Sequence, residues 1–303
     1  MMHMAVLKTS GLTKKFGEFK ALDGVDIEVQ AGEVFGFIGP NGSGKSTTLR
    51  VLLGILQATE GKVEIFGLDA WKDAVEIHKR VAYVPGDVNL WPNLTGGEVI
   101  DLFIKLRGGK PDGKREELIR RFDLDPRKKC RTYSKGNRQK VALVAALCMD
   151  ADLYILDEPT SGLDPLMERV FQEYVMEVKA KGKSVLLSSH ILSEVEKICD
   201  KVAIIQQGKI IESGTLKELR HLTGTIVQVE TKLPIAGLRE MKGVSGVTAE
   251  DGTVSFQADT EELDAIMRHI SAFGITRMDS SPPTLEELFI RHYETAARPG
   301  GGG

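Results

Sequence analysis

The chain has 303 residues, of which 42% are hydrophobic and 27% are charged, and 40 Lys and Arg residues against 43 Asp and Glu residues give a formal net charge of −3. This length allows one large domain or two ordinary ones, and the composition excludes a disordered or fibrous protein. The balanced charge does not indicate a general nucleic-acid-binding surface, so no nucleic-acid partner is expected. No apolar run approaches the roughly 18 residues that a membrane-spanning helix requires.

Short apolar, β-branched runs alternate with helical patterns through the first two thirds of the chain. Buried parallel strands are predicted at residues 34–39, 153–157, 184–189 and 202–207. Helices are predicted at residues 45–53, 138–147, 166–181 and 192–198. The alternation predicts an α/β fold whose parallel core sheet is covered by helices on both faces. Amphipathic runs at residues 5–10, 24–29 and 62–67 predict an additional antiparallel β subdomain.

A helical subdomain is predicted from about residue 86 to 150, where strand signals vanish. It includes Thr95 and Glu98, a hydroxyl and a carboxylate three residues apart, ahead of the apolar helical run VIDLFIKL. This spacing is the capping-box pattern that begins a helix.

The pattern changes again near residues 219 to 224. From there the chain reads β-α-β-β-α-β, with a helix predicted at 234–242 and a hairpin turn at Asp251 and Gly252. This order predicts a small α+β domain of ferredoxin-like type over residues 224–295, with a last helix capped by Thr284 and Glu287. The Gly-rich residues 296–303 are expected to form a disordered tail.

A phosphate-binding loop is predicted between the strand at 34–39 and the helix at 45–53. The sequence GPNGSGKS has the pattern GxxxxGK[ST], and both flanking elements are those that this motif requires. Glycines let backbone N–H groups turn inward around phosphate oxygens, Lys45 would reach the β- and γ-phosphates, and Ser46 would bind Mg²⁺. The candidate residues of this loop are Gly39, Pro40, Asn41, Gly42, Ser43, Gly44, Lys45, Ser46 and Thr47.

Two acidic residues end the strand at 153–157. Asp157 is at the strand tip, where P-loop proteins hold Mg²⁺, and Glu158 is placed to polarise the attacking water. Adjacent carboxylates at a strand end are more often plain solvated charge when they occur alone. The phosphate-binding loop upstream favours the catalytic interpretation.

With these motifs, the chain resembles the ATP-binding-cassette (ABC) ATPases over residues 5–220. The segment YSKGN at 133–137 occupies the place of the family signature LSGGQ, SGLD at 161–164 is similar to the D-loop, and His190 resembles the switch histidine. Phe16 resembles the aromatic residue that stacks on adenine. The resemblance implies that Ser134, Gly136, Asn137 and Asp164 serve nucleotide contacts across a dimer interface, and that His190 hydrogen-bonds the γ-phosphate.

The resemblance also implies a head-to-tail dimer of two copies of the chain. Ser134 and Gly136 precede a helix, so a hydroxyl, backbone N–H groups and the helix dipole converge on one anion-binding spot. In the family, this spot of one copy closes on ATP held by the phosphate-binding loop of the other, which gives two sites at a two-fold interface. A P-loop kinase or GTPase would have no use for these segments.

The sequence departs from the family pattern in two places. In the signature, Lys135 and Asn137 replace the first Gly and the Gln. After the predicted strand RVAYVP at 80–85, Gly86 and Asp87 stand where the family carries a Gln that reaches the Mg²⁺ and water region. Either Asp87 or a water molecule takes over part of that role, with Asp87 as a candidate metal ligand, or Asp87 only stabilises the turn.

The resemblance extends to the ATPase subunits of ABC-2-type exporters, the group that includes daunorubicin-resistance and bacitracin-resistance pumps. It implies an ATP- and Mg²⁺-dependent ATPase at the cytoplasmic face of the membrane that drives efflux of a drug, lipid or other hydrophobic compound through a separate permease. Leu90 and Trp91 in the loop at 87–93 either dock the permease or pack inward. A soluble ABC ATPase that acts on ribosomes or DNA is the alternative.

Overall fold

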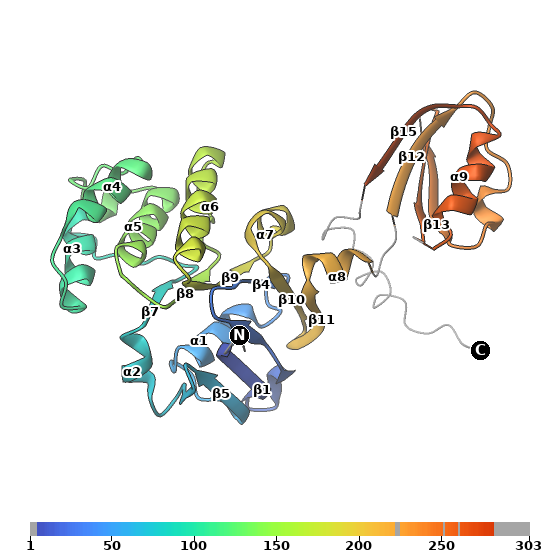
Figure 1. Cartoon of the computed structure of the whole chain (residues 1–303). Helices are drawn as coiled ribbons and strands as arrows, with labels where there is room; N and C mark the ends of the chain where they lie inside the picture. The colour runs from blue at the N-terminus through green and yellow to red at the C-terminus, as the bar shows by residue number, and fades with distance from the viewer. Residues whose placement is uncertain (1–4, 222–224, 251, 260, 282–303) are drawn as a thin grey trace. The chain divides into compact units, whose positions relative to one another are not determined.

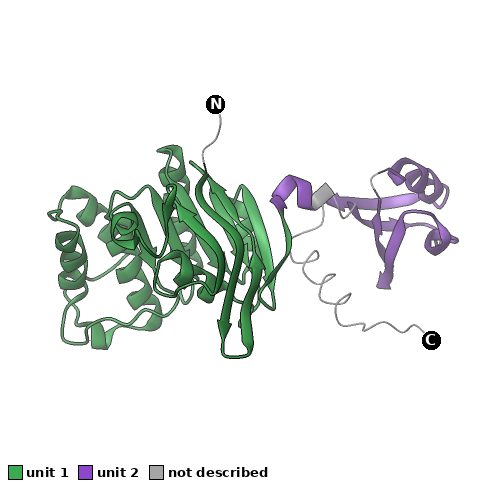
Figure 2. Ribbon diagram, turned by 90° about the horizontal axis from the view of Figure 1, so that it is seen from below, with its two compact units in different colours: residues 1–213 green, residues 214–303 purple. Residues whose placement is uncertain are grey.

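The computed structural model describes residues 5–221, 225–250, 252–259 and 261–281. It divides into two compact units, residues 1–213 and residues 214–303, shown in Figure 2. Each unit is described by itself.

The core of unit 1 is a six-stranded sheet in the order β11-β10-β4-β9-β8-β7 (Figure 1). Its strands are β4 (Val34–Ile38), β7 (Val81–Val84), β8 (Leu153–Asp157), β9 (Ser184–Ser189), β10 (Lys201–Gln206) and β11 (Lys209–Thr215). The five neighbouring strands from β10 to β7 are parallel, so their carboxyl ends meet at one edge. Every residue of β4, β8 and β9 is buried, which is why these segments read as continuous apolar runs.

The antiparallel β subdomain predicted beside the core sheet is also present. It has the order β2-β1-β5-β6, with β3 paired to β1. Its strands are β1 (Ala5–Phe16), β2 (Phe19–Val25), β3 (Glu28–Gln30), β5 (Glu60–Ile65) and β6 (Leu68–Asp69). The strand predicted at 24–29 is in fact divided between β2 and β3. β2 pairs with the C-terminal half of β1, and β3 pairs with its N-terminal half.

Unit 1 contains the helices predicted at 45–53, 138–147, 166–181 and 192–198 and a helix over the run VIDLFIKL, whereas its helices at 74–78 and 113–121 were not predicted individually. They are α1 (Lys45–Leu52), α2 (Ala74–His78), α3 (Gly96–Leu106), α4 (Gly113–Arg121), α5 (Lys135–Leu147), α6 (Pro165–Ala180) and α7 (Leu192–Ile198), with a 3-10 turn at Cys130–Thr132. The capping box at the start of α3 is formed in both directions between Thr95 and Glu98. Helix α5 begins three residues earlier than predicted, at Lys135, because Ser134 caps it.

Unit 2 contains α8 (Leu216–His221) and a four-stranded antiparallel sheet in the order β13-β14-β12-β15. Its strands are β12 (Thr225–Thr231), β13 (Val244–Glu250), β14 (Thr253–Ala258) and β15 (Ile275–Ser281), and α9 spans Leu263–Ser271. In sequence terms the order is 2-3-1-4, which is that of a ferredoxin-like sheet. Val227, Val229, Phe256, Ile266 and Ile270 form its core between the sheet and α9.

One helix prediction in unit 2 is wrong. The helix predicted at 234–242 is only a 3-10 turn, Leu238–Glu240, because Gly237 in front of it has a φ of 72° and interrupts the helical backbone. The helix predicted after Thr284 and the tail at 296–303 lie outside the described residues.

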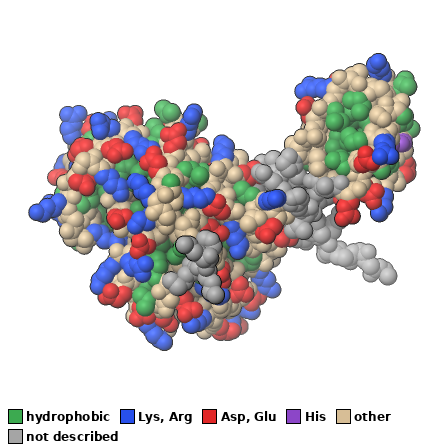
Figure 3. All heavy atoms as spheres, in the orientation of Figure 1, with side chains coloured by type: hydrophobic (Ala, Val, Ile, Leu, Met, Phe, Trp, Pro, Cys, Tyr) green, Lys and Arg blue, Asp and Glu red, His purple; other side chains and the backbone are tan. Residues whose placement is uncertain are grey.

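The described residues contain no helix that combines the length and apolarity needed to cross a bilayer. On the face of unit 1 in Figure 3, basic and acidic side chains are interspersed and neither sign dominates.

Candidate nucleotide-binding and catalytic site

The phosphate-binding loop connects β4 to α1 at the carboxyl edge of the core sheet. Lys45, the first residue of α1, is only 5% exposed, and its Nζ donates to the carbonyl oxygens of Gly39 at 2.6 Å and Pro40 at 3.3 Å. Gly44 caps the helix with a φ of 113°, and a Cβ there would lie 2.8 Å from Leu22 Cδ2. Only glycine fits this position, so the loop conformation that presents N–H groups inward is fixed by the sequence.

A pocket opens over this loop. It brings together residues of the loop, Glu158, and two residues of β2, and its lining is Phe19, Ala21, Pro40, Asn41, Gly42, Gly44, Lys45, Ser46, Thr47 and Glu158. Of the other two candidate loop residues, Ser43 is buried, and Gly39 accepts the hydrogen bond from Lys45. The backbone donors at a helix N-terminus and the Lys45 ammonium make this pocket suited to phosphate groups.

Asp157 ends β8 beside this loop and is 5% exposed. Its Oδ1 accepts a hydrogen bond of 2.5 Å from the Ser188 hydroxyl, and Ser188 is opposite Asp157 in the parallel pairing of β8 and β9. The carboxylate also influences the neighbouring Tyr83: burial first, and then the Asp157 charge, raise the pKa of Tyr83 to about 12. Asp157 is therefore held in one orientation at the sheet edge, as a metal ligand must be.

Glu158 connects three functional elements. Its backbone has a φ of 47°, in the left-handed region that non-glycine residues rarely adopt, and its N–H bonds to the Ser188 carbonyl and hydroxyl. Its Oε1 lies 3.3 Å from Lys45 Nζ, and its Oε2 lies 2.6 Å from His190 Nδ1. A carboxylate oxygen is an acceptor, so we assign the ring proton to Nδ1. The structure thus places both residues that the sequence analysis named as catalytic in direct contact.

The residues present fit ATP and Mg²⁺. Among the described residues, Ser43 Oγ in the phosphate loop and Glu158 Oε1 in the pocket are buried and have no hydrogen-bond partner, although Glu158 Oε1 is within ion-pair distance of Lys45. Ser46 and Asp157 supply hard oxygen ligands beside the phosphate pocket. No cluster of three His, Cys, Asp or Glu side chains suited to a metal occurs in the described part of the chain. Mg²⁺ takes few protein ligands and completes its shell with phosphate and water oxygens, so oxygen ligands from Ser46 and Asp157 are sufficient to hold it.

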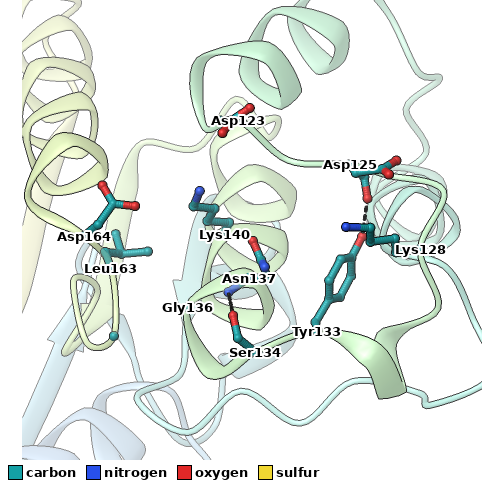
Figure 4. Close-up of a pocket in the computed structure, with 11 residues that line it drawn as sticks. Asp123, Asp125, Lys128, Tyr133, Ser134, Gly136, Asn137, Lys140, Leu163 and Asp164 are labelled. Carbon is teal, nitrogen blue, oxygen red and sulfur yellow. Dashed lines mark hydrogen bonds between the residues drawn. The ribbon is translucent and has the colours of Figure 1, made fainter.

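The signature segment forms the wall of a second pocket, shown in Figure 4. Ser134 is the N-cap of α5 and its Oγ accepts from the Asn137 N–H at 3.3 Å. Gly136 is required here, because a Cβ would lie 2.2 Å from the Gly162 carbonyl oxygen. Asp164 lines the same pocket and caps α6 by accepting from the Met167 N–H. The structure therefore brings the predicted signature and D-loop residues together on one surface.

Two candidate residues lie away from the pockets. Phe16 ends β1, is 49% exposed, and is paired across the hairpin with Phe19, which is the aromatic residue that lines the phosphate pocket. Asp87 is exposed and accepts a hydrogen bond from the Asn89 amide, and it does not line the phosphate pocket. The adenine contact of Phe16 and the metal contact of Asp87 stay predictions.

Sequence reasoning missed the side chains that support the loop after Glu158. Gln139 Nε2 donates to the Pro159 carbonyl at 3.0 Å, and Lys135 Nζ donates to the Ser161 hydroxyl at 2.8 Å. No periodicity or motif spacing links residues some 20 to 26 positions apart. The only available signal for Ser188 was that the strands at 153–157 and 184–189 both end at this edge.

Comparison with known proteins identifies the family. The ABC transporter family model matches residues 22–161, and that of the ATP-binding protein DrrA1-3-like C-terminal domain matches residues 214–293. Daunorubicin resistance ATP-binding protein DrrA3 of Streptomyces coeruleorubidus is 32% identical over 299 residues, covering 94% of each chain. Bacitracin transport ATP-binding protein BcrA of Enterococcus faecalis is 28% identical, covering 94% of this chain and 96% of that protein.

Comparison with solved structures leads to the same family. The ATP-binding subunit of an ABC transporter shares 33% identity with a TM-score of 0.66, covering 72% of this chain and 92% of that one. A dimeric ATP-binding cassette in a post-hydrolysis state, bound to ADP and Pi, shares 26% identity with a TM-score of 0.63, covering 69% and 98%. The fold is that of a P-loop ABC cassette. The chain belongs to the ABC transporter ATP-binding proteins, in the group with a DrrA-like C-terminal domain, and it is an Mg²⁺-dependent ATPase.

Proposed function

We propose that the chain drives efflux of a drug, lipid or other hydrophobic compound through a separate permease at the cytoplasmic face of the membrane. In this assignment residues 5–220 are the motor, with a helical subdomain at about 86–150, and residues 224–295 are an accessory domain. The supporting observation is the contact of Glu158 with His190 beside the phosphate pocket, in a chain whose full-length relatives are named for daunorubicin resistance and bacitracin transport.

Hydrolysis follows from the placement of the charged groups. Lys45, now 3.3 Å from Glu158, exchanges that carboxylate for phosphate oxygens, which frees Glu158 to accept a proton from the attacking water. His190 holds Glu158 through its Nδ1–H. Its contact with the γ-phosphate stays a prediction, because Nε2 donates to a phosphate oxygen only when it also carries a proton. Ser46 and Asp157 would hold Mg²⁺, whose charge would offset that of the phosphate oxygens.

The signature surface completes the site from a second copy of the chain. Within one chain, the pocket of Ser134, Gly136 and Asn137 is separate from the phosphate pocket, and the two share no lining residue. An anion-binding helix N-terminus on this surface is explained if it closes on the ATP of a partner chain. Hydrolysis then opens the dimer and delivers a stroke to the permease.

The permease docking surface is assigned to the loop that contains Trp91. The Trp91 ring is 51% exposed and lies against Phe103 of α3, with ring centroids 6.3 Å apart. Leu106, three residues further along α3, is also exposed. This half-exposed apolar group on the helical subdomain suits the apolar face of a permease coupling helix.

The test is to express the chain with a Glu158→Gln substitution and to isolate it from detergent-solubilised membranes with ATP and Mg²⁺. We expect a dimer with ATP retained at both sites and an integral membrane protein that copurifies. Trp91→Ser should lose the membrane protein and keep the ATP-bound dimer. Recovery of the chain with ribosomes or DNA and without any membrane protein would overturn the proposal.

A further inference from the structure

Three side-chain contacts link the end of β8 and the loop that follows it to the end of β9 and the segment that follows it. The parallel pairing of these strands ends where Asp157 is opposite Ser188, and the Ser188 hydroxyl makes the first contact. The second is between Glu158 and His190. The third joins Thr160, two residues beyond Glu158, to Glu194 in the first turn of α7, where the Thr160 hydroxyl donates to Glu194 Oε2 at 2.7 Å.

The third contact is buried. Glu194 is 8% exposed and Thr160 is 6% exposed. Burial raises the pKa of the Glu194 carboxyl, the hydrogen bond from Thr160 opposes this, and the charges of Glu168 and Glu158 add to the increase while His190 lowers it. A carboxyl group in such a place costs folding free energy that an apolar side chain would not. A role other than packing would explain why a carboxyl group stands at this buried position.

The hydrogen bond of Glu194 joins it to the loop after Glu158 and not to a residue that lines the phosphate pocket. Glu194 itself does not line the phosphate pocket, and it belongs to no metal-binding cluster of the described residues. Its partner Thr160 follows Pro159, whose carbonyl is held from the opposite side by Gln139 of the signature helix α5. The loop after Glu158 is thus fixed between α5 and α7, and Glu194 is the anchor on the α7 side.

We propose that Glu194 is a positioning residue. By binding Thr160 it holds the loop after β8 at a fixed position relative to α7, and it thereby keeps the left-handed backbone at Glu158 in place opposite His190. Thr160 is two positions after Glu158 and Glu194 is four positions after His190, so the outer contact limits how far the inner pair can move apart. Without it, α7 and the loop after β8 are free to separate, and the inner pair loses its alignment. The inference rests on the proposed catalytic roles of Glu158 and His190.

The experiment compares Glu194→Leu with Glu194→Gln, and Thr160→Val with Thr160→Ser, in the full chain. Leu and Val remove the acceptor and the donor at similar size, whereas Gln and Ser keep them. We expect Glu194→Leu and Thr160→Val to lower kcat about tenfold, with KM for ATP within about twofold of the wild type, because misplaced catalytic groups cost rate and the ATP cradle is untouched. The Gln and Ser variants should retain most of the rate, and the double variant Glu194→Leu/Thr160→Val should be no slower than either single variant.

Hydrogen exchange gives a readout that does not depend on activity. The Ser161 N–H bonds to the Glu158 carbonyl and the Leu163 N–H to the Thr160 carbonyl, so these amides report on the loop. Their exchange should accelerate in Glu194→Leu and stay as in the wild type in Glu194→Gln. A lower melting temperature with unchanged kcat per folded protein and unchanged loop exchange would overturn the inference. If Glu158→Gln keeps full hydrolysis, the catalytic assignment fails, and the exchange data still decide whether Glu194 anchors the loop.

Discussion

Gly86 lies directly against the carboxylate of Asp157. A Cβ placed on Gly86 would lie 3.3 Å from both Cγ and Oδ2 of Asp157, which is closer than side chains normally pack. Asp157 cannot readily yield, because it is buried and bonded to Ser188. A side chain at the position of the family Gln would therefore press on Asp157, the predicted metal ligand, and glycine avoids this contact.

Gly86→Ala should consequently disturb the metal site. We expect the affinity for Mg²⁺ to fall about tenfold, the size of loss seen when the groups that orient a metal ligand are changed. Binding of ATP in the presence of EDTA should stay unchanged, because Gly86 does not line the phosphate pocket. The measurement is ATPase rate against free Mg²⁺, with equilibrium binding of a fluorescent ATP analogue as the control. An unchanged Mg²⁺ dependence would show that Asp157 has room to move.

Lys45→Ala and Glu158→Gln should separate nucleotide binding from hydrolysis. Removing the Lys45 ammonium should weaken ATP binding about 10- to 100-fold, because hydrogen bonds to charged groups contribute about 1.5–3 kcal/mol. Glu158→Gln should keep binding and lower kcat by roughly 10²- to 10⁴-fold, the range for loss of a general base. Equilibrium binding and phosphate release measure the two effects. Equal loss of binding in both variants would refute the role assignment.

The two aromatic rings of the β1–β2 hairpin can be distinguished by substitution. Phe16→Ala should raise KM for ATP about tenfold, since stacking of a base on an aromatic ring contributes about 1–3 kcal/mol. Phe16→Trp should preserve the affinity. Phe19 lines the phosphate pocket, so Phe19→Ala should change KM for ATP and GTP alike, without selectivity for the base. A base-selective effect of Phe19→Ala alone would assign adenine stacking to Phe19.

Sequence patterns were sufficient for the parts of the molecule that local chemistry determines. The hydrophobic run before Gly39 predicts the strand, and the glycine-rich phosphate-loop motif predicts the helix after Gly44. The Thr95 capping box is a local interaction and was predicted from its spacing. The helix predicted at 234–242 was wrong because periodicity outweighed the single interruption at Gly237. When helical periodicity and a helix-interrupting glycine occur in the same segment, the sequence does not show which of them determines the backbone, because that depends on tertiary packing.

Contacts between distant segments could not be predicted in the same way. Glu194 reads as an ordinary polar residue near the start of a helix, and only the fold shows that it is buried against Thr160. Lys135 reads as an additional positive charge for phosphate, whereas its ammonium is bonded to the Ser161 hydroxyl of the same chain. Hydrogen bonds between such distant residues depend on the paths of the loops at the edge of the sheet, and the periodicity of the sequence does not indicate these paths.

The bond between Lys135 and Ser161 leads to an expectation about cooperativity. It joins the signature turn, which in the proposed dimer faces the ATP of the partner chain, to the loop that begins at the chain's own Glu158. Lys135→Met and Ser161→Ala should each lower the Hill coefficient of ATP hydrolysis toward 1, and Lys135→Arg should keep it. In a double-mutant cycle the combined variant should be no worse than the single ones, because both remove the same link. The readout is rate against ATP concentration.

The alternative is that Lys135 acts only through its charge. Lys128→Met is the control, since Lys128 is an exposed lysine that lines the signature pocket and no hydrogen bond or ion pair of its side chain occurs among the described residues. If charge alone matters, this control should lower the Hill coefficient as Lys135→Met does, and Ser161→Ala should have no effect. If the bond matters, the control keeps the cooperativity and Ser161→Ala loses it. The contact is exposed in the single chain and is worth little there, so the effect should appear only when ATP brings two chains together.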